Sequence, residues 1–471
     1  MNLAKCTLIA VIMLLHFFSA DLCNGDTLTV TNLFSFGTSP NAWGPVDTLT
    51  QTTNIFYSTT PGGGPTGDGS IFTITTNGSF NALVYFSRTN GSIPKGGLVQ
   101  GLDGNFYGTT FGGGTPDING DLLGTVFRAT PSGVITSLVS FGGTNGWGPM
   151  GRLLQGTDGF LYGTTRSGGP AYNPNTLPFN YGNGTVFRIS TNGTLTTLAS
   201  FDGTNGAYPL GVLYEVTNGI FYGTCSSGGI SNMGTIFQIS TNGTLNTLAS
   251  FNGTNGSAPQ AGLIKGRDGF FYGTTLNGGQ SGNGTIFRMD NGDAITTLYS
   301  FTGLQNDGSN PYDVLTQGAD GNLYGTTCNG GAYNLGVVFQ ATTTGNLTTL
   351  YSFHYDFALP RDGGQPYGGL IQSGDGYFYG TAKGGGAYGG GTFFRFPIPP
   401  TPEITAQPNR TMAFSWFSVV GGLYQLQYTT NLISTNWVNL GGVITATNVI
   451  ANGTDDAPPD LQRFYRILLK Q

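Results

Sequence analysis

The chain has 471 residues, 81 of them glycine, and only 8% of its residues are charged. A hydrophobic content of 38% and an aromatic content of 13% exclude a disordered glycine-rich linker, and the glycines do not recur at every third position as collagen requires. The net charge of −6, without a cluster of lysine or arginine, argues against a nucleic-acid partner.

Residues 1–25 have the pattern of a secretory signal. Lys5 supplies a positive charge, residues 8–18 are mostly apolar, and the segment around Cys23 provides a cleavage site. We therefore expect an exported protein that acts outside the cell, at the cell surface or in the periplasm. No later segment reaches the run of about 18 apolar residues that a spanning helix needs, so we expect no membrane span in the mature chain.

Removal of this signal leaves two cysteines, Cys225 and Cys328. They belong to non-adjacent copies of the repeat described next, at neighbouring strand positions whose side chains face opposite ways. A disulfide needs two close cysteines that point toward each other, so we expect two buried thiols instead.

A short sequence of phenylalanine or leucine followed by tyrosine, glycine and threonine recurs along the chain, most clearly at 106–110, and a worn first copy has Ser58 in place of the glycine. Its tyrosines are 50 to 60 residues apart, and each is followed by a pair of glycines six and seven positions later. The copies are marked by Tyr57, Tyr107, Tyr162, Tyr222, Tyr272, Tyr324 and Tyr379. The chain therefore contains seven units.

Each unit has the pattern of four short strands, as in the second unit at 97–100, 106–110, 124–128 and 135–141. Asp-Gly or Asn-Gly pairs separate the strands and predict two-residue hairpin turns, which require positive φ. Seven four-stranded units predict an all-β fold, with a seven-bladed β-propeller over residues 26–396.

The two ends of the repeat region complement each other. The seventh unit ends at Phe396 without a fourth strand, and residues 28–36 carry the missing strand pattern ahead of the first unit. We expect this N-terminal strand to close the last blade, which removes exposed sheet edges.

A proline-rich segment, 397–403, follows as a stiff linker. Residues 404–471 alternate apolar and polar side chains in several short runs, including 412–416 and 424–428, and predict a small β-sandwich-like domain. This part resembles the C-terminal modules of many exported proteins of environmental bacteria.

The glycine-rich unit itself resembles that of the GloVer tandem-repeat family of secreted bacterial proteins, over roughly residues 28–396. The resemblance implies export and a repeat scaffold. It implies no reaction, because the family offers no established catalytic residues to transfer.

The loops of the repeats are the candidate binding face. All length variation falls in the Gly-Gly loops and in the connections between units, which the connectivity places on one rim. Trp43 and Trp147, each two residues before the first proline of a unit, are candidate ligand-binding residues together with Tyr172 and Tyr181. Aromatic faces of this kind stack on sugar rings, although these side chains also suit packing over the loop.

The channel wall offers a second set of candidates. Asp47 and Asp313 stand two residues after the first proline of their units, where the other units have glycine or alanine, and Arg152 stands one position further on. A glycosidase needs two carboxyl groups about 5–9.5 Å apart. The sequence does not give the distance between Asp47 and Asp313, so these residues are weak candidates for a catalytic site. Their alternative role is to cap turns.

Metal and cofactor chemistry finds little support. Asp117, Asn119 and Asp121 alternate oxygen ligands as calcium loops do, but no glutamate completes the set, and they remain weak candidates. His354 is the only histidine after the signal, so a multi-histidine metal centre is excluded. We expect a solvated loop histidine in a connection that also contains Asp356, Arg361 and Asp362, and we expect no cofactor.

Three hypotheses for function remain. The first is an exported, non-enzymatic binding or cell-surface scaffold, with polysaccharide or another surface protein as partner. The second is a polysaccharide-active hydrolase that uses Asp47 and Asp313 at the channel mouth. The third is a purely structural envelope protein.

Overall fold

The computed structural model describes residues 28–37, 42–117, 119–175, 181–305, 307–354, 362–407, 411–431, 436–456 and 463–470. The described residues form strands and no helix, so the fold is all-β. No described helix is long and apolar enough to cross a membrane. The expected signal at 1–25 lies outside these ranges, as do Asp356 and Arg361.

The chain divides into two compact units. One contains Thr31–Ile371 and Tyr379–Arg395, and the other contains Met1–Val30, Gln372–Phe378 and Phe396–Gln471.

The described part of the repeat region forms seven sheets of four or five strands, which we number 1 to 7 in chain order, besides one two-stranded sheet. Sheet 1 contains β3 (Thr50–Thr52), β4 (Ile55–Thr60), β6 (Ser70–Thr75) and β7 (Phe80–Tyr85). Sheet 2 contains β8 (Val99–Gln100), β9 (Phe106–Thr110), β10 (Thr125–Ala129) and β11 (Ile135–Ser140). Sheet 3 contains β12 (Leu154–Gln155), β13 (Leu161–Thr165), β14 (Thr185–Ile189) and β15 (Leu195–Ser200).

The next three sheets repeat this order. Sheet 4 contains β16 (Ala207–Pro209), β17 (Tyr214–Thr217), β18 (Ile220–Ser227), β19 (Thr235–Ser240) and β20 (Leu245–Ser250). Sheet 5 contains β21 (Ile264–Lys265), β22 (Phe271–Thr275), β23 (Thr285–Met289) and β24 (Ile295–Ser300). Sheet 6 contains β25 (Gly308–Pro311), β26 (Thr316–Gln317), β27 (Leu323–Gly330), β28 (Val337–Ala341) and β29 (Leu347–Ser352).

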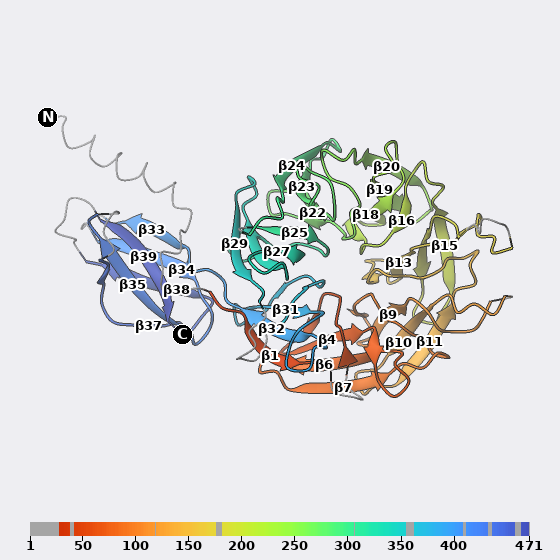
Figure 1. Cartoon of the computed structure of the whole chain (residues 1–471), viewed down its shortest axis with the longest axis horizontal. Helices are drawn as coiled ribbons and strands as arrows, with labels where there is room; N and C mark the ends of the chain where they lie inside the picture. Colours follow the sequence, from red (N-terminus) through yellow and green to blue (C-terminus); the bar gives the residue numbers. More distant parts are fainter. Residues whose placement is uncertain are drawn as a thin grey trace. The chain divides into compact units, whose positions relative to one another are not determined.

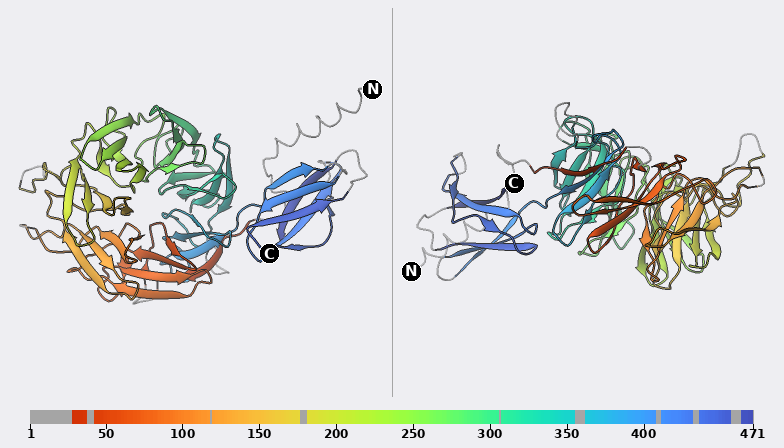
Figure 2. Two further views of the ribbon diagram at one scale, coloured as in Figure 1. Left: turned by 180° about the vertical axis from the view of Figure 1, so that it is seen from behind. Right: turned by 90° about the horizontal axis from the view of Figure 1, so that it is seen from below.

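Sheet 7 joins the two ends of the repeat region. It contains β30 (Ile371–Gln372), β31 (Phe378–Ala382), β32 (Thr392–Phe396) and β1 (Thr31–Ser35). The N-terminal strand therefore pairs with the last repeat, with Thr31 opposite Arg395 and Ser35 opposite Thr392. Figures 1 and 2 show the sheets following one another around a common centre in chain order.

The recurring glycine of each repeat makes room for aromatic packing inside the sheet. A Cβ at Gly108 would lie 2.6 Å from Cζ of Phe127, which comes from the neighbouring strand and is fully buried. The same overlap occurs at Gly273, where Phe287 is the neighbour. Glycine therefore makes room for the phenylalanine ring in the second to seventh repeats, whereas the first repeat has the buried Ser58 opposite Phe72.

The connections between sheets have a shared backbone conformation. The residue before the first proline of each repeat has a φ between +53° and +61° at Gly44, Ile93, Gly148, Tyr208, Ala258, Asn310 and Gln365. At Ile93 the N–H donates to the carbonyl of Asp68 at 2.9 Å, and its own carbonyl accepts from the N–H of Phe111 at 3.1 Å. Backbone bonds to the preceding and the same repeat hold this otherwise unfavourable conformation.

The connection and the Gly-Gly loop of one repeat lie side by side, as the connectivity predicted. In the first repeat, β2 (Ala42–Trp43) pairs with β5 (Gly62–Gly63), and in the third repeat Trp147 pairs with Ser167. Both loops of a repeat are thus on one rim, and their backbones support each other.

The prediction of two-residue hairpin turns is wrong for the Asp-Gly pairs. In the pair Asp103-Gly104, the glycine has positive φ, at +79°, and the aspartate does not. The N–H of Gly104 donates to the carbonyl of Gly101 at 2.9 Å. The arrangement is a type I turn followed by a left-handed glycine. The Asp103 carboxylate explains this choice, because it accepts bonds from the N–H of Asn105 at 3.1 Å and the hydroxyl of Tyr107 at 2.8 Å.

The Asn-Gly turns follow the same rule. Gly193 has φ +95° and donates its N–H to the carbonyl of Ser190 at 2.9 Å. In the fifth repeat, Asp293 and not Gly292 takes the left-handed position, with φ +64°. The residue that directly follows the two central residues of the turn is left-handed, whether or not it is a glycine.

Both cysteines of the repeat region are free and buried, which confirms the prediction of two thiols. Burial raises the pKa of Cys225 well above its usual value and that of Cys328 to about 11. Neither is therefore a reactive thiolate at neutral pH.

The second unit contains two small antiparallel sheets. One contains β33 (Pro402–Ala406), β34 (Met412–Phe417) and β38 (Ile450–Asp455). The other contains β35 (Leu423–Thr429), β36 (Val438–Asn439), β37 (Ile444–Thr445) and β39 (Phe464–Lys470). Trp416 is buried with Tyr424, and a buried ion pair of 2.7 Å joins Arg463 to Asp455.

Candidate functional site: a pocket lined by all seven repeats

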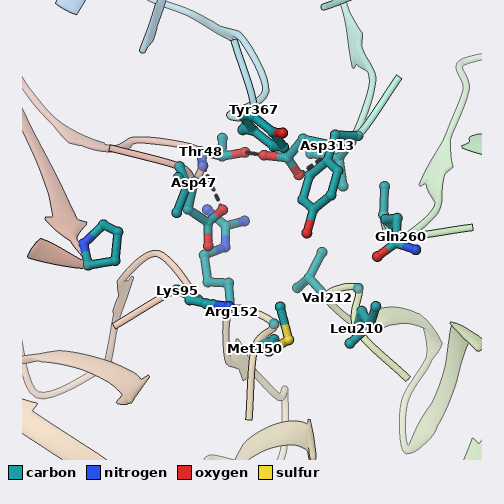
Figure 3. A pocket seen from close by; sticks show the side chains of 18 of the residues that line it. Asp47, Thr48, Lys95, Met150, Arg152, Leu210, Val212, Gln260, Asp313 and Tyr367 are labelled. Carbon is teal, nitrogen blue, oxygen red and sulfur yellow. Dashed lines mark hydrogen bonds between the residues drawn. The ribbon is translucent and has the colours of Figure 1, made fainter. Parts of the chain in front are cut away.

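The first candidate site is a cavity of about 210 Å³, which we call the inner pocket. Most of its lining comes from the residues that follow the first proline of each repeat, and all seven repeats contribute to it. The lining residues include Val46. Figure 3 shows the side chains of ten others that converge on the pocket: Asp47, Thr48, Lys95, Met150, Arg152, Leu210, Val212, Gln260, Asp313 and Tyr367. The structure thus brings together the three predicted channel residues Asp47, Arg152 and Asp313.

The pocket position differs among repeats that otherwise agree. The fourth residue after the proline is leucine in every repeat, at Leu49, Leu98, Leu153, Leu213, Leu263, Leu315 and Leu370. These leucines are buried. The first residue after the proline changes through Val46, Lys95, Met150, Leu210, Gln260, Tyr312 and Tyr367. The core positions are therefore uniform, whereas the positions that face the pocket are chemically diverse.

Asp47 is anchored by backbone amides on both carboxylate oxygens. Its Oδ1 accepts the N–H of Thr48 at 2.6 Å, and its Oδ2 accepts the N–H of Gly97 in the second repeat. Burial and the nearby Asp313 carboxylate raise the pKa of Asp47 to about 7, while Arg152 acts in the opposite direction. Asp47 therefore joins two repeats, and its environment favours the protonated carboxyl far more than water does.

Asp313 joins three repeats. Its Oδ1 accepts the N–H of Val314 at 2.7 Å, and its Oδ2 accepts the N–H of Gly369 at 2.6 Å and the hydroxyl of Thr48 at 2.8 Å. Burial raises the pKa of this carboxyl, although these hydrogen bonds oppose the effect. Thr48 contacts both carboxyl groups, so Asp47 and Asp313 form one connected network.

A second cavity of about 550 Å³, the outer pocket, shares Lys95, Met150, Leu210 and Gln260 with the inner one. Arg166 and Tyr208 are among its other lining residues. Lys95, Arg166 and Lys383 are site residues that were not predicted from the sequence. Arg166 and Lys383 directly follow the second threonine position of their strands, so the signal was the repeat position and not a local motif.

The aromatic residues predicted to bind a ligand divide into separate places on the loops. The rings of Trp147 and Tyr181 lie 5.0 Å apart, whereas Tyr172 donates its hydroxyl to Asp117 at 3.3 Å. Trp43 is 49% exposed in the first repeat. None of the four side chains lines the inner or the outer pocket.

The candidate calcium loop is an ordinary turn in the structure. Oδ1 of Asp117 accepts the N–H groups of Asn119 at 2.8 Å and Asp121 at 2.9 Å. Although partial burial opposes the effect, these bonds hold the pKa of Asp117 below its usual value. Among the described residues, no group of three or more histidine, cysteine, aspartate or glutamate side chains is arranged to hold a metal.

His354 is not the freely solvated histidine that the sequence predicted. Its Nδ1 lies 3.1 Å from Asp362 and 3.3 Å from the hydroxyl of Tyr351. Tyr351 also donates to Asp362. The two ends of the long connection therefore meet at this histidine, which the spacing of residues in the sequence did not reveal.

These features define an all-β tandem-repeat protein with a central pocket. The chain belongs to the Gloeobacter/Verrucomicrobia repeat family, whose model matches residues 17–177, 101–268 and 233–447. No curated protein matches it.

Solved structures resemble the chain only distantly. A puromycin hydrolase has 12% identity and a TM-score of 0.44, covering 79% of this chain and 58% of its own. A luciferin-regenerating enzyme has 12% identity and a TM-score of 0.40, with coverage of 79% and 95%. The PQQ-bound aldose sugar dehydrogenase of Streptomyces coelicolor has 12% identity and a TM-score of 0.38, with coverage of 79% and 99%. At this level of similarity, no function of these proteins can be assigned to the chain.

Proposed function

We propose that this protein is an exported, non-enzymatic binding scaffold built on a seven-bladed β-propeller, with polysaccharide as its ligand. The seven sheets in chain order and the pairing of β1 with β32 support the propeller. In this proposal residues 1–25 are a signal, 26–396 the propeller, 397–403 a linker and 404–471 a β-sandwich-like domain. The protein acts outside the cell, at the cell surface or in the periplasm.

The observation that carries the proposal is the diversity of the pocket-facing position. The buried leucine that follows it is uniform in all seven repeats, whereas the pocket position includes apolar, amide, cationic and aromatic side chains. A ligand that contacts each repeat differently explains this contrast. A purely structural ring has no need for six different residue types at this position around its centre.

Two features favour polysaccharide as the ligand. Tyr312 and Tyr367 line the inner pocket with their rings 4.9 Å apart, and Gln260 adds an amide that both donates and accepts hydrogen bonds. Aromatic faces stack on sugar rings, and ligand pockets combine such faces with a few polar groups. Trp147 and Tyr181 on the rim offer a further aromatic surface to a long glycan.

Affinity electrophoresis of the full chain tests the proposal. Native gels would contain galactan, xylan, laminarin or polygalacturonate, and mobility would be compared with a gel that lacks glycan. We expect retardation by at least one of them. Leu210→Trp, which adds a bulky ring at a position that lines both pockets, should abolish or strongly weaken it.

Leu102→Trp is the matched control. Leu102 is 82% exposed and lines neither pocket, so the same change of side chain should leave retardation intact. Absence of retardation in every gel would refute the polysaccharide proposal and favour a structural envelope role. Equal retardation of Leu210→Trp and the wild type would place binding elsewhere, and Trp43→Ala and Trp147→Ala would then test the rim.

A hydrolase remains the second candidate, because two carboxyl groups line one pocket and the pKa of Asp47 is raised to about 7. A carboxyl group with such a pKa suits general acid catalysis. Against this role, both oxygens of Asp47 and of Asp313 accept backbone N–H groups. Release of reducing sugar from a bound glycan, lost in Asp47→Asn and Asp313→Asn, would favour the hydrolase, and no release would favour the scaffold.

A further inference from the structure

The pockets carry a charge opposite to that of the whole chain. The net charge of the protein is −6, yet four of its 17 lysine and arginine side chains line the two pockets: Lys95, Arg152, Arg166 and Lys383. Among the residues that the structure describes, the acidic side chains that line them are two, Asp47 and Asp313. In a chain with so few charges, this concentration of cations stands out.

Three of these cations lie over aromatic rings. Nζ of Lys95 is 4.7 Å from the centre of the Phe111 ring, and Nζ of Lys383 is 4.9 Å from that of Tyr367. The guanidinium of Arg166 is 5.6 Å from the ring of Tyr208. The rings stabilise the cations through cation–π attraction without neutralising them. Lys95, Arg166 and Lys383, which we call the cation triad, are thus held with their charges intact.

The cation triad lacks a carboxylate partner. The ion pairs found within the described residues are His354–Asp362 and Arg463–Asp455, and neither involves the triad. Burial, together with Arg166 and Lys383, lowers the pKa of Lys95. The two pocket carboxyl groups are bonded to backbone amides, and Arg152 is the cation that acts on both. An anionic ligand would therefore reduce the repulsion of Lys95 by Arg166 and Lys383, which no carboxylate of the described residues offsets through an ion pair.

We propose that the outer pocket binds the carboxylate of an acidic sugar residue, so that the preferred ligand is a uronate-containing polysaccharide. This inference rests on the proposed polysaccharide-binding function and adds the chemical class of the sugar. The planar guanidinium of Arg166 suits a carboxylate, Lys95 of the same pocket adds a point charge, and Lys383 adds a further positive charge from the inner pocket. Tyr208 and Phe111, both in the outer pocket, supply apolar faces for the sugar ring.

Isothermal titration of the full chain with tetragalacturonate and with neutral galactotetraose tests this inference. We expect tighter binding of the acidic oligomer, and weaker binding as the salt concentration rises from 50 to 200 mM because exposed charges are screened over roughly 8–10 Å. Lys95→Gln, Arg166→Gln and Lys383→Gln should each weaken acidic binding about tenfold or more, since a hydrogen bond to a charged group is lost.

Lys265→Gln is the matched control. Lys265 also lies over a ring, 5.7 Å from the centre of Phe271, but it lines neither pocket, so its replacement should change affinity less than about twofold. Lys95→Arg keeps the charge and should retain most of the affinity, which separates loss of charge from loss of folding.

The outcomes separate this inference from the proposal on which it rests. Equal or tighter binding of the neutral oligomer would overturn the acidic-sugar inference and leave the polysaccharide scaffold in place. Absence of binding by every glycan would refute both. An equal loss in Lys265→Gln and Lys95→Gln would show nonspecific charge attraction and also overturn the inference.

Discussion

Replacement of Gly211 by alanine tests how closely the repeats approach each other around the inner pocket. A Cβ at Gly211 would lie 2.4 Å from the amide nitrogen of Gly262 and 2.5 Å from the carbonyl carbon of Ala261. Both atoms are backbone atoms of the fifth repeat. Carbon atoms in optimal contact are about 3.5–4.0 Å apart, so the added methyl group overlaps its neighbours by about 1 Å.

The overlap cannot be relieved by rotation of a side chain. One repeat must shift relative to the next, and overpacking of this kind costs about 1–3 kcal/mol. The fifth repeat has Ala261 at the position equivalent to Gly211, so the restriction comes from the adjacent backbone and not from the conformation of the repeat itself. We expect Gly211→Ala to lower the free energy of unfolding by an amount near the upper end of that range.

Guanidinium unfolding followed by tryptophan fluorescence measures this effect. Gly142→Ala is the matched control, because its nearest neighbour is Oδ1 of Asn145 at 4.0 Å. Its φ is not left-handed, so the control should be neutral or stabilised by up to about 1 kcal/mol through the unfolded state. Equal unfolding midpoints for the two variants would refute the packing argument.

Three further predictions concern the titratable groups. The pKa of Asp47 is about 7 in the folded protein and 3.8 ordinarily, so between pH 4 and 7 the folded state keeps a proton that the unfolded state releases. The free energy of unfolding should therefore fall as the pH rises through that interval. Asp47→Asn should reduce the difference between the free energies of unfolding at pH 5 and at pH 8. Tyr272→Phe removes a hydrogen bond of 2.5 Å to Asp268 and should cost about 1.5–3 kcal/mol in chemical unfolding, whereas an unchanged midpoint would show that the bond is not stabilising. Cys225 and Cys328 should resist Ellman's reagent at pH 8 in the native protein and react fully in guanidinium, and rapid native labelling would contradict their burial.

The strands of the repeat region were predictable because every unit repeats the same physical constraints. A glycine that accommodates a phenylalanine ring, such as Gly108 under Phe127, recurs in every copy but the first, which has Ser58 there. The pairing of β1 with β32 followed from the missing strand of the seventh unit. The turn conformation was not predictable from the Asp-Gly pairs alone, because it depends on the bond from Tyr107 to Asp103 across the hairpin.

The candidate site was predictable only where one residue type departed from the repeat pattern. Asp47 and Asp313 replace a glycine or alanine and were found for that reason. The cation triad was missed because its members occupy two different positions of the repeat, one after the first proline and one after the Gly-Thr strand. Lys95 and Arg166 line one pocket because the folded chain brings the segment after the first proline of one repeat close to the end of the Gly-Thr strand of the next.

The pairing of rim aromatics was out of reach for a related reason. Tyr172 and Tyr181 lie in the same long loop, yet one contacts Asp117 of the second repeat and the other contacts Trp147. The conformation of a loop with no counterpart in the other repeats cannot be inferred from them.

The most direct test of the central claim is a crystal structure of the protein with the oligosaccharide that binds most tightly. The account predicts the sugar in the inner and outer pockets, with an acidic group within hydrogen-bond distance of Lys95, Arg166 or Lys383. A ligand seated instead against Trp147 and Tyr181, with both pockets holding only water, would contradict it.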